Sequence, residues 1–357
     1  MHIVFAPDSY GGFLSSAAAC ERVESELASH GLFISPHPMS DGGEGLLETL
    51  VAHSTVELHG CEVMGPMEPV FASIGRKDGC WWIEAAEAIG LQHVHGPRTP
   101  LQATSAGLGE LLRTANTRGA GPIIVGLGGS ATVDGGLGMV QELGLTAFNE
   151  NGHAIAPHGC GADLAKVTRI EGEPPLGDRL IRVLCDVRTP IGHSVQTFGP
   201  QKGLSQDQIG PQKEAMDQWV DVLSTWRKLH GLPEIPPSIR GGGAAGGIGY
   251  ALASICNAHL VQGAQFVAKI SGLHGAIENA QFVIIGEGRL DPTSYEGKVA
   301  EVVTKLARKH GAKVIAFVGQ SSECPPAPVG PDEVIEMNGE SDASFQAATE
   351  QLAALLS

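Results

Sequence analysis

The sequence predicts an α/β fold with two domains, each containing a mainly parallel sheet. The chain has 357 residues, more than the roughly 250–300 at which a single core stops growing. Short apolar strands alternate with amphipathic helical stretches, as in parallel α/β proteins. This alternation is clearest in the first and last thirds. We therefore expect one domain from residues 1–75 and 270–357, and a second from residues 76–269.

Each element follows from a local pattern. Residues 3–6 form a continuous apolar run, as expected of a buried strand. Ser15 or Ser16 can cap a helix reaching about residue 30, with Val23 and Leu27 on one face. A strand at 32–35 and a helix at 46–51 follow. Further strands are predicted at 56–63, 70–74, 80–84, 123–125, 181–185, 282–285 and 314–318, and helices at 104–118, 205–230, 251–256, 299–310 and 344–356. Trp81 and Trp82 are adjacent in a strand, so at most one is expected to face the core.

Composition limits the possible functions. Apolar residues make up 42% of the chain and charged residues 17%, which argues against disorder. A net charge of −16 argues against nucleic-acid or anionic-membrane partners. No apolar run reaches the roughly 18–20 residues of a membrane span, and the N-terminal residues lack a signal-peptide pattern. The seven cysteines form no CxxC pair, so neither a disulfide framework nor a zinc site is indicated. We expect a cytoplasmic protein with small-molecule substrates; homo-oligomer formation is left open.

Acidic residues follow three of the predicted strands. Asp8, Asp186 and Glu287 each come just after an apolar run. The carboxyl ends of strands in open α/β sheets are where ligands bind. Any one of these acids can instead be a helix cap. Carboxylates at that edge suit Mg²⁺, so Asp186 and Glu287 are candidate metal ligands.

The glycine-rich loop at residues 126–138, GLGGSATVDGGLG, is a candidate phosphate site. Glycines such as Gly128, Gly129 and Gly135 let backbone amides approach an anion, and a helix N-terminus after the loop favours negative charge. Ser130 adds a hydroxyl, and Asp134 is a candidate metal ligand or base. The loop also fits a dinucleotide fingerprint, as does the run from residue 241 to 246. Neither precedes a strand ending in an acid at the spacing that ribose binding requires. A third interpretation is that the small residues of the loop only allow close packing of a helix against a strand and bind no ligand.

Three further segments carry charged side chains next to glycines. Residues 286–298 contain Glu287, Arg289, Asp291 and Lys298, which can neutralise a transferring phosphoryl group or simply form a surface ion-pair turn. The run DGGEG at residues 41–45 contains Asp41 and Glu44. This run can also be a simple turn with an acid that caps a helix. Lys202 is expected within a turn at 198–203, where a solvated lysine is the plainer reading. The motifs of P-loop NTPases and protein kinases are absent.

Taken together, these segments resemble the bacterial glycerate kinase family. The matching runs are APDSYGGFLS (6–15), MSDGGEG (39–45), GLGGSATVDGGLGM (126–139), CDV (185–187), FGPQKG (198–203), GAAGGIGYAL (243–252) and GEGRLD with GK (286–298). The resemblance implies two α/β domains with the active site in the cleft between them. It also implies transfer of a phosphoryl group from ATP, with Mg²⁺, to D-glycerate, most simply at the C2 hydroxyl.

The resemblance also implies roles for the candidate residues. Expected catalytic residues are Asp8, Asp41, Asp134, Asp186, Arg289 and Lys298. Expected nucleotide contacts are Gly128, Gly129, Ser130, Gly135, Lys202 and Glu287. Expected substrate contacts are Ser9, Glu44, Arg289 and Asp291. The sequence does not choose among Asp8, Asp41 and Asp134 as the group that accepts the substrate proton.

Several positions depart from the family pattern. Gly11 replaces a lysine, Val133 an amide, and Arg188 and Thr189 an acid and its neighbour. They leave substrate identity open to a kinase for another small hydroxy acid. A catalytically weak sensor that binds glycerate or nucleotide is a further alternative, and a nicotinamide-dependent dehydrogenase a minor one.

Overall fold

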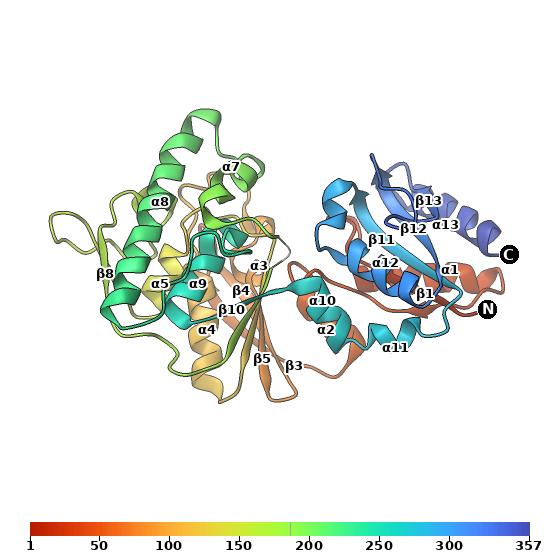
Figure 1. Ribbon diagram of the computed structural model, residues 1–357, viewed down its shortest axis with the longest axis horizontal. Helices are drawn as coiled ribbons and strands as arrows, with labels where there is room; N and C mark the ends of the chain where they lie inside the picture. The colour runs from red at the N-terminus through yellow and green to blue at the C-terminus, as the bar shows by residue number, and fades with distance from the viewer. Residues whose placement is uncertain (186) are drawn as a thin grey trace. The chain divides into compact units, whose positions relative to one another are not determined.

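The computed structural model describes residues 1–185 and 187–357. The chain divides into two compact units, one formed by Met1–Thr55 with Gln262–Ser357 and one by Val56–Val261 (Figure 1). Both units combine helices with a sheet that is parallel in whole or in part. The predicted α/β class with mainly parallel sheets is therefore confirmed.

The first unit contains a five-stranded sheet with the order β13-β12-β11-β1-β2. Every recorded pairing in it is parallel. Its elements are β1 (Ile3–Pro7), α1 (Ser16–Ser29), β2 (Ser35–Pro36), α2 (Leu46–His53), α10 (Gly263–Ile270), α11 (Leu273–Ile277), β11 (Phe282–Leu290), the 3₁₀ helix η3 (Pro292–Tyr295), α12 (Val299–Lys309), β12 (Lys313–Ser321), β13 (Glu333–Glu336) and α13 (Asp342–Leu356). In Figure 1 the red N-terminal and blue C-terminal segments lie side by side in this unit.

The core of the first unit follows from the predicted patterns. All five residues of β1 are buried. Helix α1 begins after Ser15, whose hydroxyl accepts a hydrogen bond from the Ala18 amide. Val23 and Leu27 are fully buried on its inner face, as the helical spacing predicted. They share a cluster with Phe5 and with residues of α13, so α1 and α13 cover one face of the sheet.

The strand order of the first unit reverses direction between β1 and β11. From β1 the chain moves outward to β2, and it later returns to β11 and moves outward the other way through β12 and β13. In open parallel sheets such a switch point leaves a crevice at the carboxyl ends of the two strands. The ends of β1 and β11 are therefore where a ligand is expected.

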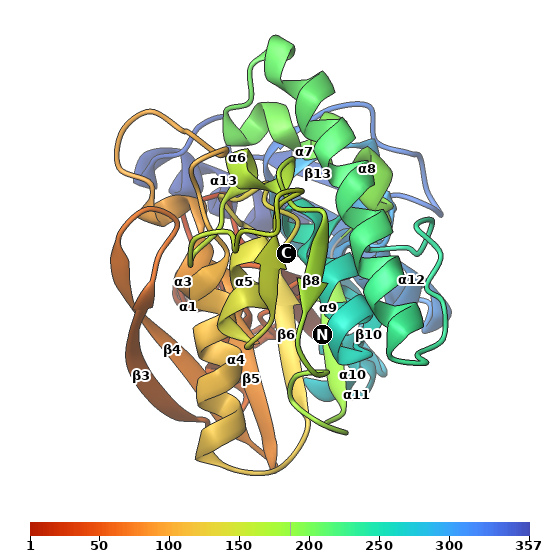
Figure 2. The same ribbon diagram turned by 90° about the vertical axis from the view of Figure 1, so that its left-hand side faces the viewer.

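The second unit contains a six-stranded sheet with the order β10-β9-β6-β5-β4-β3 and a two-stranded sheet of β7 and β8. Its strands are β3 (Glu57–Met64), β4 (Pro69–Lys77), β5 (Cys80–Glu84), β6 (Ile123–Leu127), β7 (Thr146–Phe148), β8 (Arg169–Glu171), β9 (Ile181–Cys185) and β10 (His259–Gln262). Its helices are α3 (Ala85–Ile89), η1 (Leu91–His93), α4 (Ala106–Arg118), α5 (Leu137–Glu142), α6 (Gly161–Leu164), α7 (Ile191–Lys202), α8 (Gln206–Leu229), η2 (Ala244–Gly247) and α9 (Ile248–Cys256). β5, β6 and β9 pair in parallel, whereas β3, β4 and β5 form an antiparallel meander, seen in Figure 2.

Three expectations about individual residues and strands differ from the structure. Both Trp81 and Trp82 are buried, because β5 lies inside the sheet and both of its faces are covered. Lys202 lies in the last turn of helix α7 rather than in a turn, and the helix ends at Gly203 with a φ of 105°. The second strand is shorter and later than predicted, at Ser35–Pro36.

The unit boundaries lie at residues 55/56 and 261/262, whereas the sequence suggested 75/76 and 269/270. Residues 57–64 and 69–77 fall in the second unit because β3 and β4 pair with β5. In the described ranges, no helix has the length and apolar character that crossing a lipid bilayer requires.

Candidate functional site

The first unit gathers acidic residues at the switch point of its sheet. Asp8 directly follows β1, and its amide donates to the Gly286 carbonyl of β11 at 2.8 Å. Glu287 is the next residue of β11, so the two acids lie on neighbouring strands at the same edge. Ser9 donates its amide to Asp8 Oδ1 at 2.8 Å. Two of the acids that the sequence placed after strands thus come together, although Glu287 lies within β11, which continues to Leu290.

A third acid and a lysine join this cluster. The Asp41 carboxylate accepts the Gly43 amide at 2.9 Å, which makes the DGGEG segment a tight turn. Lys298 occupies the N-cap position of α12. Its positive charge lowers the pKa of Asp8, Asp41 and Glu287 alike, so it lies near enough to interact with all three acids. We call Asp8, Asp41, Glu287 and Lys298 the acid cluster.

Burial makes ionisation of the acid cluster costly. It raises the pKa of Asp8 well above its usual value, and the nearby Asp41 and Glu287 carboxylates raise it further. Burial also raises the pKa of Asp41. The pKa of Glu287 rises to about 7, mainly through burial, although a hydrogen bond from Ser294 Oγ to Oε2 at 2.8 Å acts in the opposite direction. Such shifts are typical of functional sites.

One oxygen of Glu287 is left without a protein partner. Within the part of the chain that the structure describes, Oε1 is buried and accepts no hydrogen bond. Buried polar atoms are nearly always satisfied, so an orphaned carboxylate oxygen needs an explanation. An oxygen-seeking cation or a hydroxyl of a ligand would satisfy it.

The other predicted residues of this unit lie at the rim or in turns. Arg289 is exposed, and its Nε lies 3.9 Å from Asp291 Oδ2. Asp291 caps η3, because its Oδ1 accepts from the Thr293 amide and hydroxyl at 2.8 and 2.6 Å. These hydrogen bonds lower the pKa of Asp291. Glu44 is exposed.

Gly263 packs closely against the Asp41 turn, which leaves no room for a side chain at this position. A Cβ atom there would lie 1.8 Å from the Asp41 carbonyl oxygen, well inside van der Waals contact. We expect Gly263→Ala to displace the turn, to destabilise the first unit by about 1–3 kcal/mol, and to lower turnover. Urea unfolding and steady-state kinetics measure both. The matched control is Gly275→Ala in α11, where an added Cβ meets nothing within 4 Å; equal effects of the two changes would contradict this role.

His37 makes the first unit sensitive to acid. It is buried, its ring lies 4.4 Å from the His53 ring between centroids at a tilt of 50°, and its Nε2 lies 3.0 Å from Ser271 Oγ. Burial, followed by the nearby His53, lowers its pKa to about 4 from an ordinary 6.5. The unfolded chain therefore binds a proton at pH values where the folded chain does not. Folding stability from this group is complete above pH 6.5 and is lost as the pH falls toward 4.

The expected loss is about 3 kcal/mol, taking about 1.4 kcal/mol for each pKa unit. Urea unfolding of the wild type and of His37→Gln at pH 7 and pH 4.5 tests it. The acids of the cluster have raised pKa values and so act with the opposite sign, but they are common to both proteins. The wild type should lose more stability than His37→Gln over this range; parallel profiles would refute the assignment.

In the second unit, Asp134 organises the glycine loop. Its carboxylate is fully buried and accepts hydrogen bonds from the Ser105 amide (2.9 Å), the Ser105 hydroxyl (2.6 Å), the Gly136 amide (3.0 Å) and the Gly138 amide (3.3 Å). Burial raises its pKa, while these donors lower it. The neighbouring Gly135 donates its amide to Gly246 O and accepts from Trp219 Nε1 through its carbonyl. The loop is thus fixed from several sides.

Lys202 approaches the same loop from helix α7. Its side chain is only 5% exposed, although it carries a charge. The ammonium donates to Ser130 Oγ at 2.9 Å and to the Thr132 carbonyl at 2.7 Å. Gly128, Gly129, Ser130 and Lys202 line one open pocket of about 400 Å³. The predicted nucleotide contacts of this unit therefore share one site, except for Gly135, which does not line it.

Val133 is explained by its surroundings. It is 2% exposed and belongs to the hydrophobic core of the second unit, so an apolar residue suits this position. Gly11, the other departure in a motif, is exposed and has a φ of +56°. Arg188 is exposed as well. Asp186, a predicted catalytic and metal-binding residue, lies outside the described residues.

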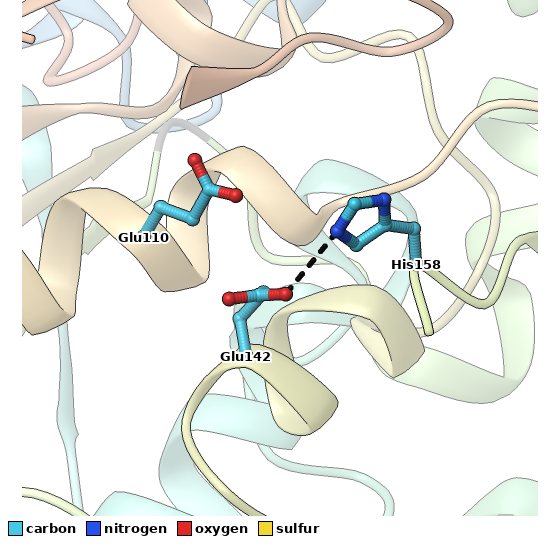
Figure 3. A group of neighbouring side chains, drawn as sticks. All are labelled: Glu110, Glu142 and His158. Atoms are coloured by element: carbon cyan, nitrogen blue, oxygen red, sulfur yellow. Dashed lines mark ion pairs between the residues drawn. The ribbon is translucent and has the colours of Figure 1, made fainter. Parts of the chain in front are cut away.

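One group of side chains in the second unit has the spacing of metal ligands. Glu110, Glu142 and His158 bring one ligand atom each within 4.8 Å of one another, the sole such group found in residues 1–185 and 187–357 (Figure 3). Glu142 already pairs with His158 at 3.3 Å and with Arg113 at 2.8 Å. Glu110 accepts the Met64 amide at 3.0 Å. We regard the group as an ion-pair network.

The sequence missed three residues that support these sites. Ser294 orients Glu287, Ser105 anchors Asp134, and Gly263 makes room for the Asp41 turn. Ser294 lies close to its partner in sequence, within the recognised 286–298 segment. Ser105 and Gly263 lie far from the residues they support, and no local pattern marks them.

The sequence of this chain is similar to those of known proteins. The profile of the Glycerate kinase family matches residues 3–356. Glycerate 2-kinase of Escherichia coli (strain K12) is 38% identical over 335 residues, which cover 90% of this chain and 86% of that protein. Glycerate kinase of Bacillus subtilis (strain 168) is 34% identical, with 90% and 86% covered.

A solved structure is similar to this chain over its whole length. The crystal structure of a protein from Salmonella typhimurium LT2, assigned as a glycerate kinase 2, superposes with a TM-score of 0.79 at 33% identity. The match covers 100% of this chain and 98% of that one. The chain belongs to the glycerate kinase family, and it is a phosphotransferase.

Proposed function

We propose that this protein phosphorylates D-glycerate with ATP and Mg²⁺, that the product is 2-phosphoglycerate, and that it does so in the cytoplasm. The observation that carries the proposal is the acid cluster at the switch point of a parallel sheet, in a chain of the glycerate kinase family. Phosphoryl transfer depends mainly on positioning and on neutralising charge. Acids beside a lysine at a ligand-binding edge supply the groups that this chemistry needs.

In this proposal the acid cluster handles the reacting hydroxyl. Asp8 and Asp41 are the candidates that accept its proton, and their raised pKa values make them stronger bases than an ordinary carboxylate. Lys298 neutralises negative charge beside them. The exposed Arg289 is proposed to hold the substrate carboxylate, and Ser9, Glu44 and Asp291 are proposed as further substrate contacts.

The donor set also fits a divalent cation. Mg²⁺ prefers one or two carboxylates together with phosphate oxygens, and the buried, unpartnered Oε1 of Glu287 is an oxygen ligand of that kind. Bound Mg²⁺ would supply charge neutralisation on the transferring phosphoryl group. Asp186 is proposed as a second ligand from the sequence alone.

The glycine loop of the second unit is proposed to hold the nucleotide phosphates. The backbone of Gly128 and Gly129, the Ser130 hydroxyl and the buried Lys202 ammonium line one pocket, a combination that suits an anion. Asp134 accepts four hydrogen bonds from the loop and from Ser105. We therefore propose that Asp134 positions the loop and that the proton acceptor is one of the other two acids.

Identification of the product tests the proposal. Incubation with ATP, Mg²⁺ and D-glycerate followed by ³¹P NMR should give the signal of 2-phosphoglycerate. A signal of 3-phosphoglycerate would correct the position of transfer, and no phosphoglycerate would refute the proposed substrate. Tartronate and larger aldonic acids, assayed in parallel, test the alternative of another small hydroxy acid.

A further inference from the structure

The pocket beside Lys202 is lined by polar and by apolar residues. Its polar lining consists of Gly128, Gly129, Ser130, Gln201 and the Lys202 ammonium. Its apolar lining consists of Leu91, Val187, Phe198 and Ala245. A ligand that uses the whole pocket must therefore carry an anionic group and an apolar face.

Residues of the polar and of the apolar lining are held next to each other by the local structure. Phe198 and Lys202 are four residues apart in helix α7, so their side chains lie on the same face. Leu91 is tied to the glycine loop because its amide donates to the Gly129 carbonyl at 2.8 Å. The Phe198 ring, the Lys202 ammonium and the glycine loop are thus held in place before a ligand binds.

The chemistry of the pocket argues against glycerate as its full occupant. The pocket is open, and its volume of about 400 Å³ includes the solvent at its mouth. Glycerate presents a carboxylate and two hydroxyls, so it gains nothing from four apolar side chains. A purine nucleotide carries phosphates for the loop and a flat aromatic base for Phe198 and Leu91.

We propose that this pocket binds the base of a purine nucleotide, with Phe198 as the residue on which the base stacks. The inference rests on the proposed function in that it names the place of the phosphoryl donor. It adds that the base is recognised by Phe198 of helix α7 and by Leu91 of η1. Neither residue belongs to the glycine loop that is proposed to hold the phosphates.

The test compares ligands with and without a base. Isothermal titration calorimetry with ADP and with inorganic pyrophosphate is carried out on the wild type, on Phe198→Ala and on Phe198→Trp. Aromatic–base stacking of ordinary strength predicts that Phe198→Ala weakens ADP binding about tenfold. Pyrophosphate binding should not change, and Phe198→Trp should restore most of the ADP affinity. The control is Phe71→Ala, whose ring is 73% exposed on β4 and lies outside the pocket.

Kinetics give an independent measurement. In Phe198→Ala the KM for ATP should rise about tenfold, with the KM for D-glycerate within twofold of wild type. A rise in the KM for glycerate with unchanged ADP affinity would overturn the inference, as would a wild type that does not bind ADP or an equal loss of ADP and pyrophosphate binding. If ADP binding depends on Phe198 but no hydroxy acid is phosphorylated, the inference stands and the proposed function fails.

Discussion

Replacing Asp8 by asparagine is expected to slow turnover by about 10²–10⁴-fold, the usual contribution of a general base, and at the same time to raise the melting temperature. Asparagine keeps the oxygen that accepts the Ser9 amide but removes a carboxylate whose ionisation burial and Asp41 oppose. Steady-state kinetics and thermal unfolding measure the two effects.

The sign of the stability effect depends on pH. A carboxyl whose folded pKa is raised contributes stability at low pH and loses it as the pH rises through the folded pKa. The gain in Asp8→Asn should thus be present at pH 8 and vanish at pH 4. Glu21→Gln, an exposed change in α1, should alter neither turnover nor melting temperature. Turnover of Asp8→Asn within threefold of wild type would rule out this residue as the proton acceptor.

Replacing Asp134 by alanine is expected to lower the free energy of unfolding by about 4 kcal/mol. Four donors around a fully buried carboxylate lose their acceptor, and each unsatisfied buried donor costs about 1–3 kcal/mol, offset in part by relaxation of the loop. Nucleotide affinity should fall as well, since the same hydrogen bonds shape the glycine loop. Urea unfolding and ADP titration test the prediction.

Two further variants make the Asp134 test specific. Asp134→Asn keeps one acceptor oxygen and should lose less stability than the alanine variant. Asp217→Ala in α8 removes only an exposed pair with Lys213, which is worth less than about 1 kcal/mol. If Asp134→Ala unfolds like wild type, the carboxylate does not anchor the loop.

The sequence predicted the strands and helices well where the apolar pattern is regular. The 3.6-residue spacing of α1 and the apolar run of β1 are examples. It failed where tertiary context decides. Both tryptophans of β5 are buried because the strand is internal, and α7 continues through Pro200 to Lys202 although proline usually disrupts a helix interior.

The sequence identified residues of the site better than their roles. The strand pattern brought Asp8 and Glu287 together, since β1 and β11 are parallel neighbours with Pro7 opposite Gly286, although β11 continues past Glu287 to Leu290. It could not separate Asp134 from Asp8 and Asp41, because all three are acids that precede a glycine or a serine in a loop. What distinguishes Asp134 is the set of long-range hydrogen bonds that surrounds it, including two from Ser105. Such contacts leave no local signature.

The most direct test of the account is ADP release by the purified protein with ATP, Mg²⁺ and D-glycerate, measured with and without the glycerate. We expect ADP release that requires glycerate and Mg²⁺ together. A folded protein that binds ADP but releases none from ATP in the presence of D-glycerate would contradict the proposed reaction.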